Sequence, residues 1–88
     1  MRPYKPRRAP WTTPEGTPAF LEAERGGMLE RLADAREAEM VDTAALVHQW
    51  ARDVIDDDGA DLRFVAEQLA EALGTALSVA ELRGERLG

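Results

Sequence analysis

The sequence predicts an all-α protein: a small three- or four-helix domain preceded by an extended N-terminal arm rich in proline and arginine. Three observations predict this class. All five prolines lie within the first 18 of the 88 residues, and each disfavours helix at the residue before it. Beyond them, apolar residues recur at the spacing of three and four that helices require. No segment alternates apolar and polar residues as a half-buried strand does.

Charge divides the chain into an arm of residues 1–16 and a helical domain of residues 17–88. The first 18 residues carry four basic side chains against Glu15, hence +3, and the other seventy carry −9, which gives the net charge of −6. The acidic domain should repel nucleic acid, whereas the arm is attracted to any acidic surface, including the domain itself.

The first helix is expected over about residues 18–40. Thr17 is a favoured N-cap residue and Pro18 a favoured first helical residue. Gly26 and Gly27 fall inside this helix at a cost of about 1 kcal/mol each relative to alanine. We therefore expect either a break at these glycines or the close approach of another backbone. The expected buried stripe holds Phe20, Leu21, Met28, Leu29, Leu32 and Ala35.

A second helix is expected over about residues 43–56, with Asp42 as its cap. Its apolar residues have the cleanest helical spacing in the chain. They are Leu46, Val47, Trp50, Ala51, Val54 and Ile55. The acidic turn at residues 56–58, followed by Gly59, should end this helix, because carboxylates oppose the dipole at a helix C-terminus and glycine supplies the left-handed cap.

A third helix is expected to begin near Asp61 and to cover about residues 61–73, up to Gly74. Ser78 and Glu81 then have the spacing of a capping box, which predicts a short fourth helix over residues 79–83. The alternative is one helix that runs through Gly74, because the apolar stripe continues beyond this glycine. The stripe comprises Leu62, Val65, Ala66, Leu69, Ala70, Leu73, Ala76, Leu77 and Ala80.

The sequence contains little material for catalysis or for binding a metal or cofactor. It has one serine (Ser78), one histidine (His48) and no cysteine. If Gly59 were the turn glycine of a calcium-binding EF-hand loop, the first and last ligand positions would fall on Val54 and Val65, which cannot coordinate. We expect no enzymatic activity, no metal, no cofactor and no small-molecule substrate.

Residues 64–83 resemble, in part, the helix-turn-helix of small DNA-binding regulators. Ala70 precedes Gly74, the candidate turn glycine, by the expected four positions. The pattern then fails, because Ala80 stands where a β-branched residue is expected and Arg83 where an apolar anchor is expected. The second helix of this segment would also offer phosphate no net attraction. A small nucleic-acid-binding regulator is thus the alternative function.

The arm and one helix face carry residues suited to a protein partner. Aromatic and arginine side chains supply most of the binding energy at many protein interfaces. The competing interpretation is that the arm stays in solvent or folds back onto its own acidic helices. Trp50 belongs to the core or, if it remains exposed, to a self-association surface. The candidate partner-binding residues are Arg2, Tyr4, Lys5, Arg7, Arg8, Trp11 and Trp50.

The favoured function is therefore a non-enzymatic interaction protein, a structural subunit or adaptor that docks on a larger assembly through its arm. A protein partner or self-association is expected, and nucleic acid is the less favoured partner. The sequence contains no apolar run of the roughly 20 residues that a bilayer span needs and no secretory signal. We expect a cytoplasmic protein, or a component of a soluble assembly, that is neither secreted nor membrane-spanning.

Overall fold

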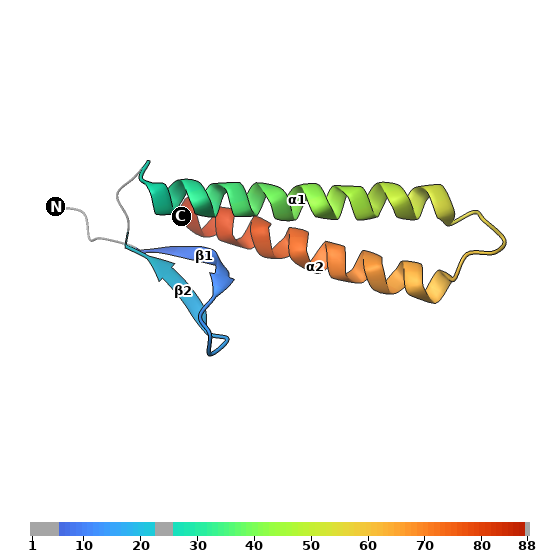
Figure 1. Ribbon diagram of the computed structural model, residues 1–88, viewed down its shortest axis with the longest axis horizontal. Coiled ribbons are helices and arrows are strands. Elements are labelled where there is room, and N and C mark those ends of the chain that lie inside the picture. The colour runs from blue at the N-terminus through green and yellow to red at the C-terminus, as the bar shows by residue number, and fades with distance from the viewer. Residues whose placement is uncertain (1–5, 23–25, 88) are drawn as a thin grey trace.

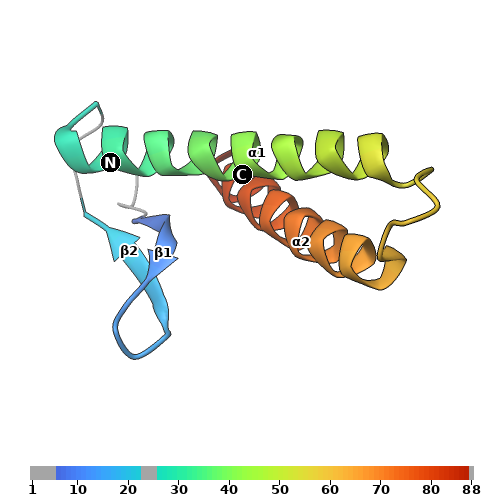
Figure 2. The same ribbon diagram turned by 45° about the vertical axis from the view of Figure 1, so that its right-hand side comes forward.

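A computed structural model of the chain describes residues 6–22 and 26–87, which form two strands and two long helices (Figure 1). α1 and α2 run antiparallel as a helical hairpin, and β1 and β2 form an antiparallel sheet at the open end of this hairpin (Figures 1 and 2). β1 contacts both helices. In chain order the elements are β1 (Arg7–Thr12), β2 (Pro18–Leu21), α1 (Met28–Val54) and α2 (Leu62–Leu87).

The predicted three- or four-helix domain with an extended arm is wrong, although the expectation of a mostly helical chain is confirmed. The predicted helices 18–40 and 43–56 are replaced by α1, which runs through Asp42, and the predicted helices 61–73 and 79–83 by α2, which runs through Gly74. An aspartate or a glycine inside a helix costs about 1 kcal/mol or less. This cost is too small to end a helix whose apolar face continues on both sides.

The continuity of α2 also removes the turn that the helix-turn-helix resemblance requires. Gly74 has no heavy atom within 4 Å of an added Cβ, so it marks neither a turn nor a close backbone contact. Ser78 lies inside α2 and does not cap a separate helix.

Residues 7–21 form a β-hairpin where an extended arm and the start of a helix were expected. Arg7 pairs with Leu21, Arg8 with Phe20 and Thr12 with Pro18, with an irregularity between the second and third pairs. Proline is compatible with this sheet because both of its strands are edge strands, on which a missing N–H can face away from the partner strand. The prolines that argued against a strand are therefore tolerated here.

A tight turn connects the two strands. The Gly16 N–H donates to the Thr13 carbonyl at 2.9 Å, and Pro14 occupies the second turn position, where its fixed φ is favoured. Gly16 has φ +82°, a conformation that glycine adopts without strain. The Thr13 and Thr17 hydroxyls lie 2.6 Å apart and close the base of the turn.

Glycine and aspartate residues mark the helix starts. Gly26, with φ +78°, and Gly27, at the N-cap position, directly precede α1, so this pair marks the start of a helix and not its interior. The Asp61 carboxylate accepts a hydrogen bond from the Phe64 N–H at 3.1 Å and caps α2. Within the inter-helix turn, Asp57 accepts from the Gly59 N–H at 3.0 Å. The acidic turn thus satisfies backbone donors that would otherwise face only solvent.

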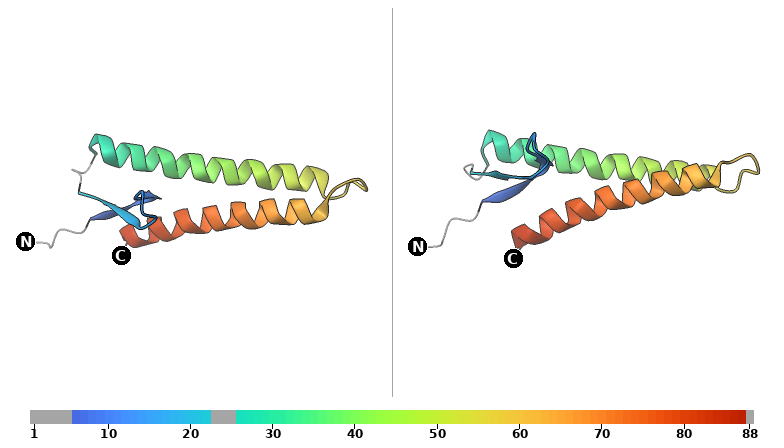
Figure 3. Two further views of the ribbon diagram at one scale, coloured as in Figure 1. Left: turned by 60° about the horizontal axis from the view of Figure 1, so that its bottom comes forward. Right: turned by 90° about the horizontal axis from the view of Figure 1, so that it is seen from below.

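α1 and α2 lie side by side beyond the inter-helix turn and diverge toward the open end, where the β-hairpin lies (Figure 3). The buried apolar residues are Ala9 of β1 and side chains on the facing sides of the two helices, which form a thin seam. The inner seam of α1 comprises the buried or half-buried residues Ala33, Glu37, Met40, Ala44, Val47, Ala51 and Val54. The inner seam of α2 comprises Val65, Gln68, Ala72, Thr75, Val79 and Leu82. Most of these side chains are small or polar, so the two helices bury little apolar area against each other.

Candidate functional site

A long row of apolar side chains lies on α2, about a third of a turn away from its inner seam. We call it the outer stripe of α2, and it comprises Leu62, Ala66, Leu69, Leu73, Ala76, Leu77, Ala80 and Leu87. Leu69 and Ala76 are half-buried and the other members are exposed. Leu62 is 59% exposed, and Leu73 and Leu77 are each 60% exposed. Large leucines left in water along a whole helix are typical of an interaction surface.

The outer stripe of α2 is more apolar than the seam that α2 uses within the chain. All of its members are leucine or alanine, whereas the inner seam includes Gln68 and Thr75. Because apolar burial drives helix association in water at about 25 cal/mol per Å², the more favourable face of α2 is the one that the single chain leaves exposed.

A second exposed stripe lies on α1, and we call it the outer stripe of α1. Its members are Met28, Leu32, Leu46 and Trp50. Charged Arg36 and Glu39, whose side chains pair with each other at 3.4 Å, interrupt this stripe. Near its end, the Trp50 ring meets the Phe64 ring edge to face, with centroids 5.9 Å apart. This pair connects the ends of α1 and α2 beside the inter-helix turn.

A buried carboxylate lies where the sheet meets the open end of the helices. Glu37 is 1% exposed. Arg86 donates to both of its oxygens, at 2.8 and 2.9 Å, and Arg7 donates to Oε2 at 3.1 Å. The Arg83 Nε lies 3.5 Å from Oε1. We call these four residues the Glu37 cluster; it joins β1, α1 and α2.

The Glu37 cluster shifts the ionisation of its members. Burial disfavours the charged carboxylate, but the hydrogen bonds from Arg86 and Arg7 outweigh burial, so the pKa of Glu37 lies below its ordinary value of 4.5. The hydrogen bonds that Arg86 donates to Glu37 also raise the pKa of Arg86. Glu37 and Arg86 are therefore both charged at neutral pH, and the cluster acts as a structural connection.

Three further ion pairs attach the β-hairpin to the helices. Arg7 Nη2 lies 2.7 Å from a carboxylate oxygen of Asp34 on α1. Arg8 donates two hydrogen bonds to Glu85 on α2, and its hydrogen bond with Glu85 raises the pKa of Arg8. Arg8 also lies 3.5 Å from Glu81. Both strand arginines thus bind acidic residues of the same chain.

The candidate residues from the sequence lie in different places and do not form one surface. Arg2, Tyr4 and Lys5 lie outside the described residues. Arg7, Arg8 and the half-buried Trp11 belong to β1 at the open end of the helical hairpin, whereas Trp50 lies near the opposite end of α1 (Figure 1).

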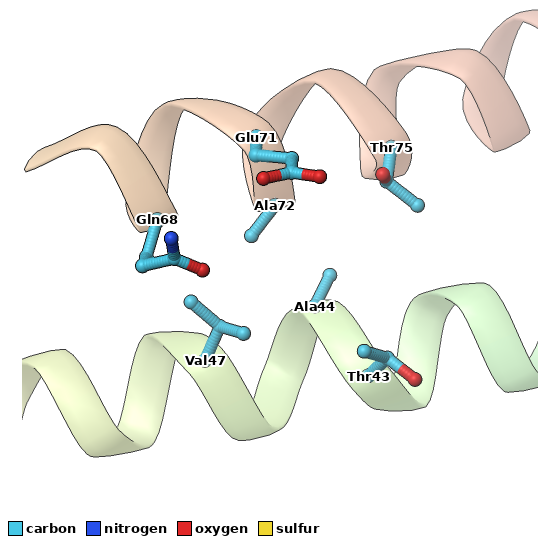
Figure 4. A pocket seen from close by; sticks show the side chains of 7 residues that line it. All are labelled: Thr43, Ala44, Val47, Gln68, Glu71, Ala72 and Thr75. Carbon is cyan, nitrogen blue, oxygen red and sulfur yellow. The ribbon is translucent and has the colours of Figure 1, made fainter. Parts of the chain in front are cut away.

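A shallow pocket lies between the middle sections of the helices, with a volume of about 170 Å³ (Figure 4). Its lining residues are Thr43, Ala44, Val47, Gln68, Glu71, Ala72 and Thr75. Among them only Glu71 ionises, so the pocket contains no acid and base pair. His48 and Ser78 lie elsewhere, on exposed positions of α1 and α2.

The described residues contain neither a candidate metal centre nor a helix that could span a membrane. No group of three or more histidine, cysteine, aspartate or glutamate side chains is placed to hold a metal ion within residues 6–22 and 26–87. Neither α1 nor α2, the two helices of this part of the chain, is long and apolar enough to cross a membrane.

Sequence reasoning missed the Glu37 cluster. The signal was present in the spacing, because Glu37 stands four residues after Ala33 and seven before Ala44, in register with the inner seam of α1. A carboxylate in an inner register requires a cationic partner. The arginines near the end of α2 could have supplied it, since a helical hairpin brings the end of its second helix beside the start of its first.

Comparison with known protein families, curated protein sequences and solved structures found no match for this chain.

Proposed function

We propose that this protein is a non-enzymatic interaction protein, a structural subunit or adaptor, that docks through the exposed outer stripes of its two helices. The observation that carries this proposal is the amount of exposed surface. The chain exposes 7022 Å², whereas a compact monomer of 9.7 kDa exposes about 5,100 Å². The excess of about 1,900 Å² is comparable to the total area that a standard protein interface buries.

The shape supports the same proposal. The Cα radius of gyration is 16.7 Å, whereas a compact domain of 88 residues has about 12 Å. A helical hairpin with one thin seam gains little apolar burial from its own folding. Docking on another molecule would supply the burial that the single chain lacks.

The β-hairpin has a supporting part in this proposal. Arg7 and Arg8 were candidate partner-binding residues, but their guanidinium groups are occupied by Asp34, Glu37 and Glu85. A partner would have to displace these intramolecular contacts to use the two arginines. We therefore assign docking to the helix faces and assign Arg7 and Arg8 to attachment of the hairpin.

Affinity capture of the tagged full-length chain from its own cells tests the proposal. We expect the wild type to be recovered in a complex of fixed composition, and Leu73→Glu or Leu46→Glu to release it, because each places a charge in an apolar contact. Ser78→Glu, an exposed position on another side of α2, is the matched control and should retain the complex. Recovery of the wild type solely as a free monomer would overturn the proposal.

A further inference from the structure

We infer that the outer stripe of α2 is a self-pairing seam, on which α2 of a second copy of this chain packs in the antiparallel direction. The inference rests on the proposed function, since it names the partner of one of the two docking faces. We choose a second copy as the partner because the residue spacing, the order of leucine and alanine and the contacts around the stripe all favour one.

The spacing along the outer stripe is that of a coiled-coil seam. Its positions 62, 66, 69, 73, 76 and 80 are separated alternately by four and three residues, and position 87 follows seven residues later. This repeat keeps one helix face against another helix over many turns. The inner seam of α2 has the same spacing and already packs against α1. α2 therefore has two seams, and residues 6–22 and 26–87 leave the outer one unoccupied.

The distribution of leucine and alanine favours an antiparallel partner with the same sequence. A two-fold axis midway between Gly74 and Thr75 sets Leu73 opposite the partner's Ala76 and Leu69 opposite the partner's Ala80. In these central pairs each leucine meets an alanine, which allows close interdigitation of the helices. Toward the ends of the stripe, Leu62 lies opposite the partner's Leu87 and Ala66 opposite the partner's Arg83. The parallel arrangement would instead set leucine against leucine and alanine against alanine at every level. Antiparallel pairing also places opposite ends of the helix dipoles side by side.

The contacts around the stripe leave it open for a second copy. Arg8 of the β-hairpin binds α2 through Glu81 and Glu85, which lie to one side of the stripe, and Leu77 and Leu87 remain exposed. Arg83, which falls in the register of the seam, turns toward Glu37 on α1. Between positions 62 and 80, every residue of the stripe is leucine or alanine, so no charged side chain interrupts it there.

The outer stripe of α1 fits this role less well, because Arg36 and Glu39 divide it. One leucine from each outer stripe, with a similar exposed fraction, gives a matched pair of substitutions. Leu73 and Leu46 are 60% and 67% exposed, so a glutamate at either position should leave the fold of the single chain intact.

Sedimentation equilibrium of the full chain tests the inference, with circular dichroism to verify helix content. We expect the wild type and Leu46→Glu to sediment at twice the chain mass of 9.7 kDa, and Leu73→Glu to sediment as a folded monomer. A wild type that stays monomeric at millimolar concentration would overturn self-pairing. A dimer that Leu46→Glu dissociates and Leu73→Glu does not would overturn the choice of seam.

A spin-label distance tests the direction of pairing. The chain has no cysteine, so Arg63→Cys, at a side chain that is 90% exposed, gives one label per copy. The antiparallel arrangement places the two labels about 35 Å apart along the helix axis, and a parallel one about 10–15 Å apart. The short distance would overturn the antiparallel arrangement.

These measurements distinguish failure of the inference from failure of the proposed function. A monomeric wild type that still captures a different protein, and loses it in Leu73→Glu, overturns self-pairing and leaves the proposed function standing. A monomeric wild type that captures nothing overturns both.

Discussion

At the scale of single residues, Glu37 determines how the N-terminal segment is attached. Its carboxylate accepts hydrogen bonds from Arg86 on α2 and from Arg7 on β1, so one buried side chain of α1 connects three elements. Taking a carboxylate out of water is unfavourable, and the arginine hydrogen bonds offset that cost only while all partners are in place. Removing one partner therefore costs more than an ordinary surface substitution.

Glu37→Gln should lower the free energy of unfolding by about 1–3 kcal/mol, because the largely buried Arg7 loses an ionised acceptor. Urea denaturation at one fixed protein concentration measures the change. Glu39→Gln, at the exposed partner of Arg36, is the control and should change it by less than about 0.5 kcal/mol. Equal effects of the two substitutions would show that the cluster contributes nothing special to stability.

The Glu37 carboxylate should also make the stability of the fold depend on pH. Because folding lowers the pKa of Glu37 below 4.5, its ionisation stabilises the fold above that pH and the contribution is lost as the pH falls through the lower, folded-state pKa. Thermal midpoints from neutral pH to about pH 3 should therefore fall more in the wild type than in Glu37→Gln. If the difference in thermal midpoint between the wild type and Glu37→Gln stays constant from neutral pH to about pH 3, this explanation of the cluster is contradicted.

At the scale of elements, local signals predicted the helical character but not the helix boundaries. The three-four spacing of α2 and the acidic turn before Asp61 are local, and they were visible in the sequence. Whether Asp42 or Gly74 ends a helix depends on a balance of about 1 kcal/mol, which the packing between α1 and α2 decides. The β-hairpin was missed because its prolines argue against strands in general, yet edge strands tolerate them.

Substitutions of Gly74, inside α2, and of Gly26, before α1, should have opposite effects on the free energy of unfolding. Gly74→Ala should raise the free energy of unfolding by up to about 1 kcal/mol, because the site is helical and open. Gly26→Ala should lower it by about 1 kcal/mol or more, because φ is +78° there. Thermal unfolding of both variants checks the pair, and a stabilising Gly26→Ala would exclude the left-handed start of α1.

The sequence showed the apolar spacing of the candidate docking surface on α2 but not the Glu37 cluster. The apolar spacing along α2 was recognised, but the residues of its outer stripe were placed on one face together with Val65 of the inner seam. Val65 and Leu73 belong to one broad apolar face, and only the angle at which α1 packs decides that the first is buried and the second exposed. The Glu37 cluster depends on residues up to 79 positions apart in the chain, and no local pattern encodes such contacts.

At the scale of the whole molecule, we propose that the single chain has an incomplete core, which a second copy of the chain completes. Its extents of 61 × 26 × 23 Å describe a rod with two apolar stripes and little interior. A protein of this size is only marginally stable by itself, and association is one of the few ways to add buried area without disulfides or metals.

The concentration dependence of thermal unfolding tests this claim most directly. If a second copy completes the core, the wild-type midpoint should rise by about 7 °C for a hundredfold increase in protein concentration, because association stabilises the folded state by mass action. The midpoint of Leu73→Glu should be lower and should not change with concentration. A wild-type midpoint that stays constant over the same range would contradict the claim that self-association completes the fold.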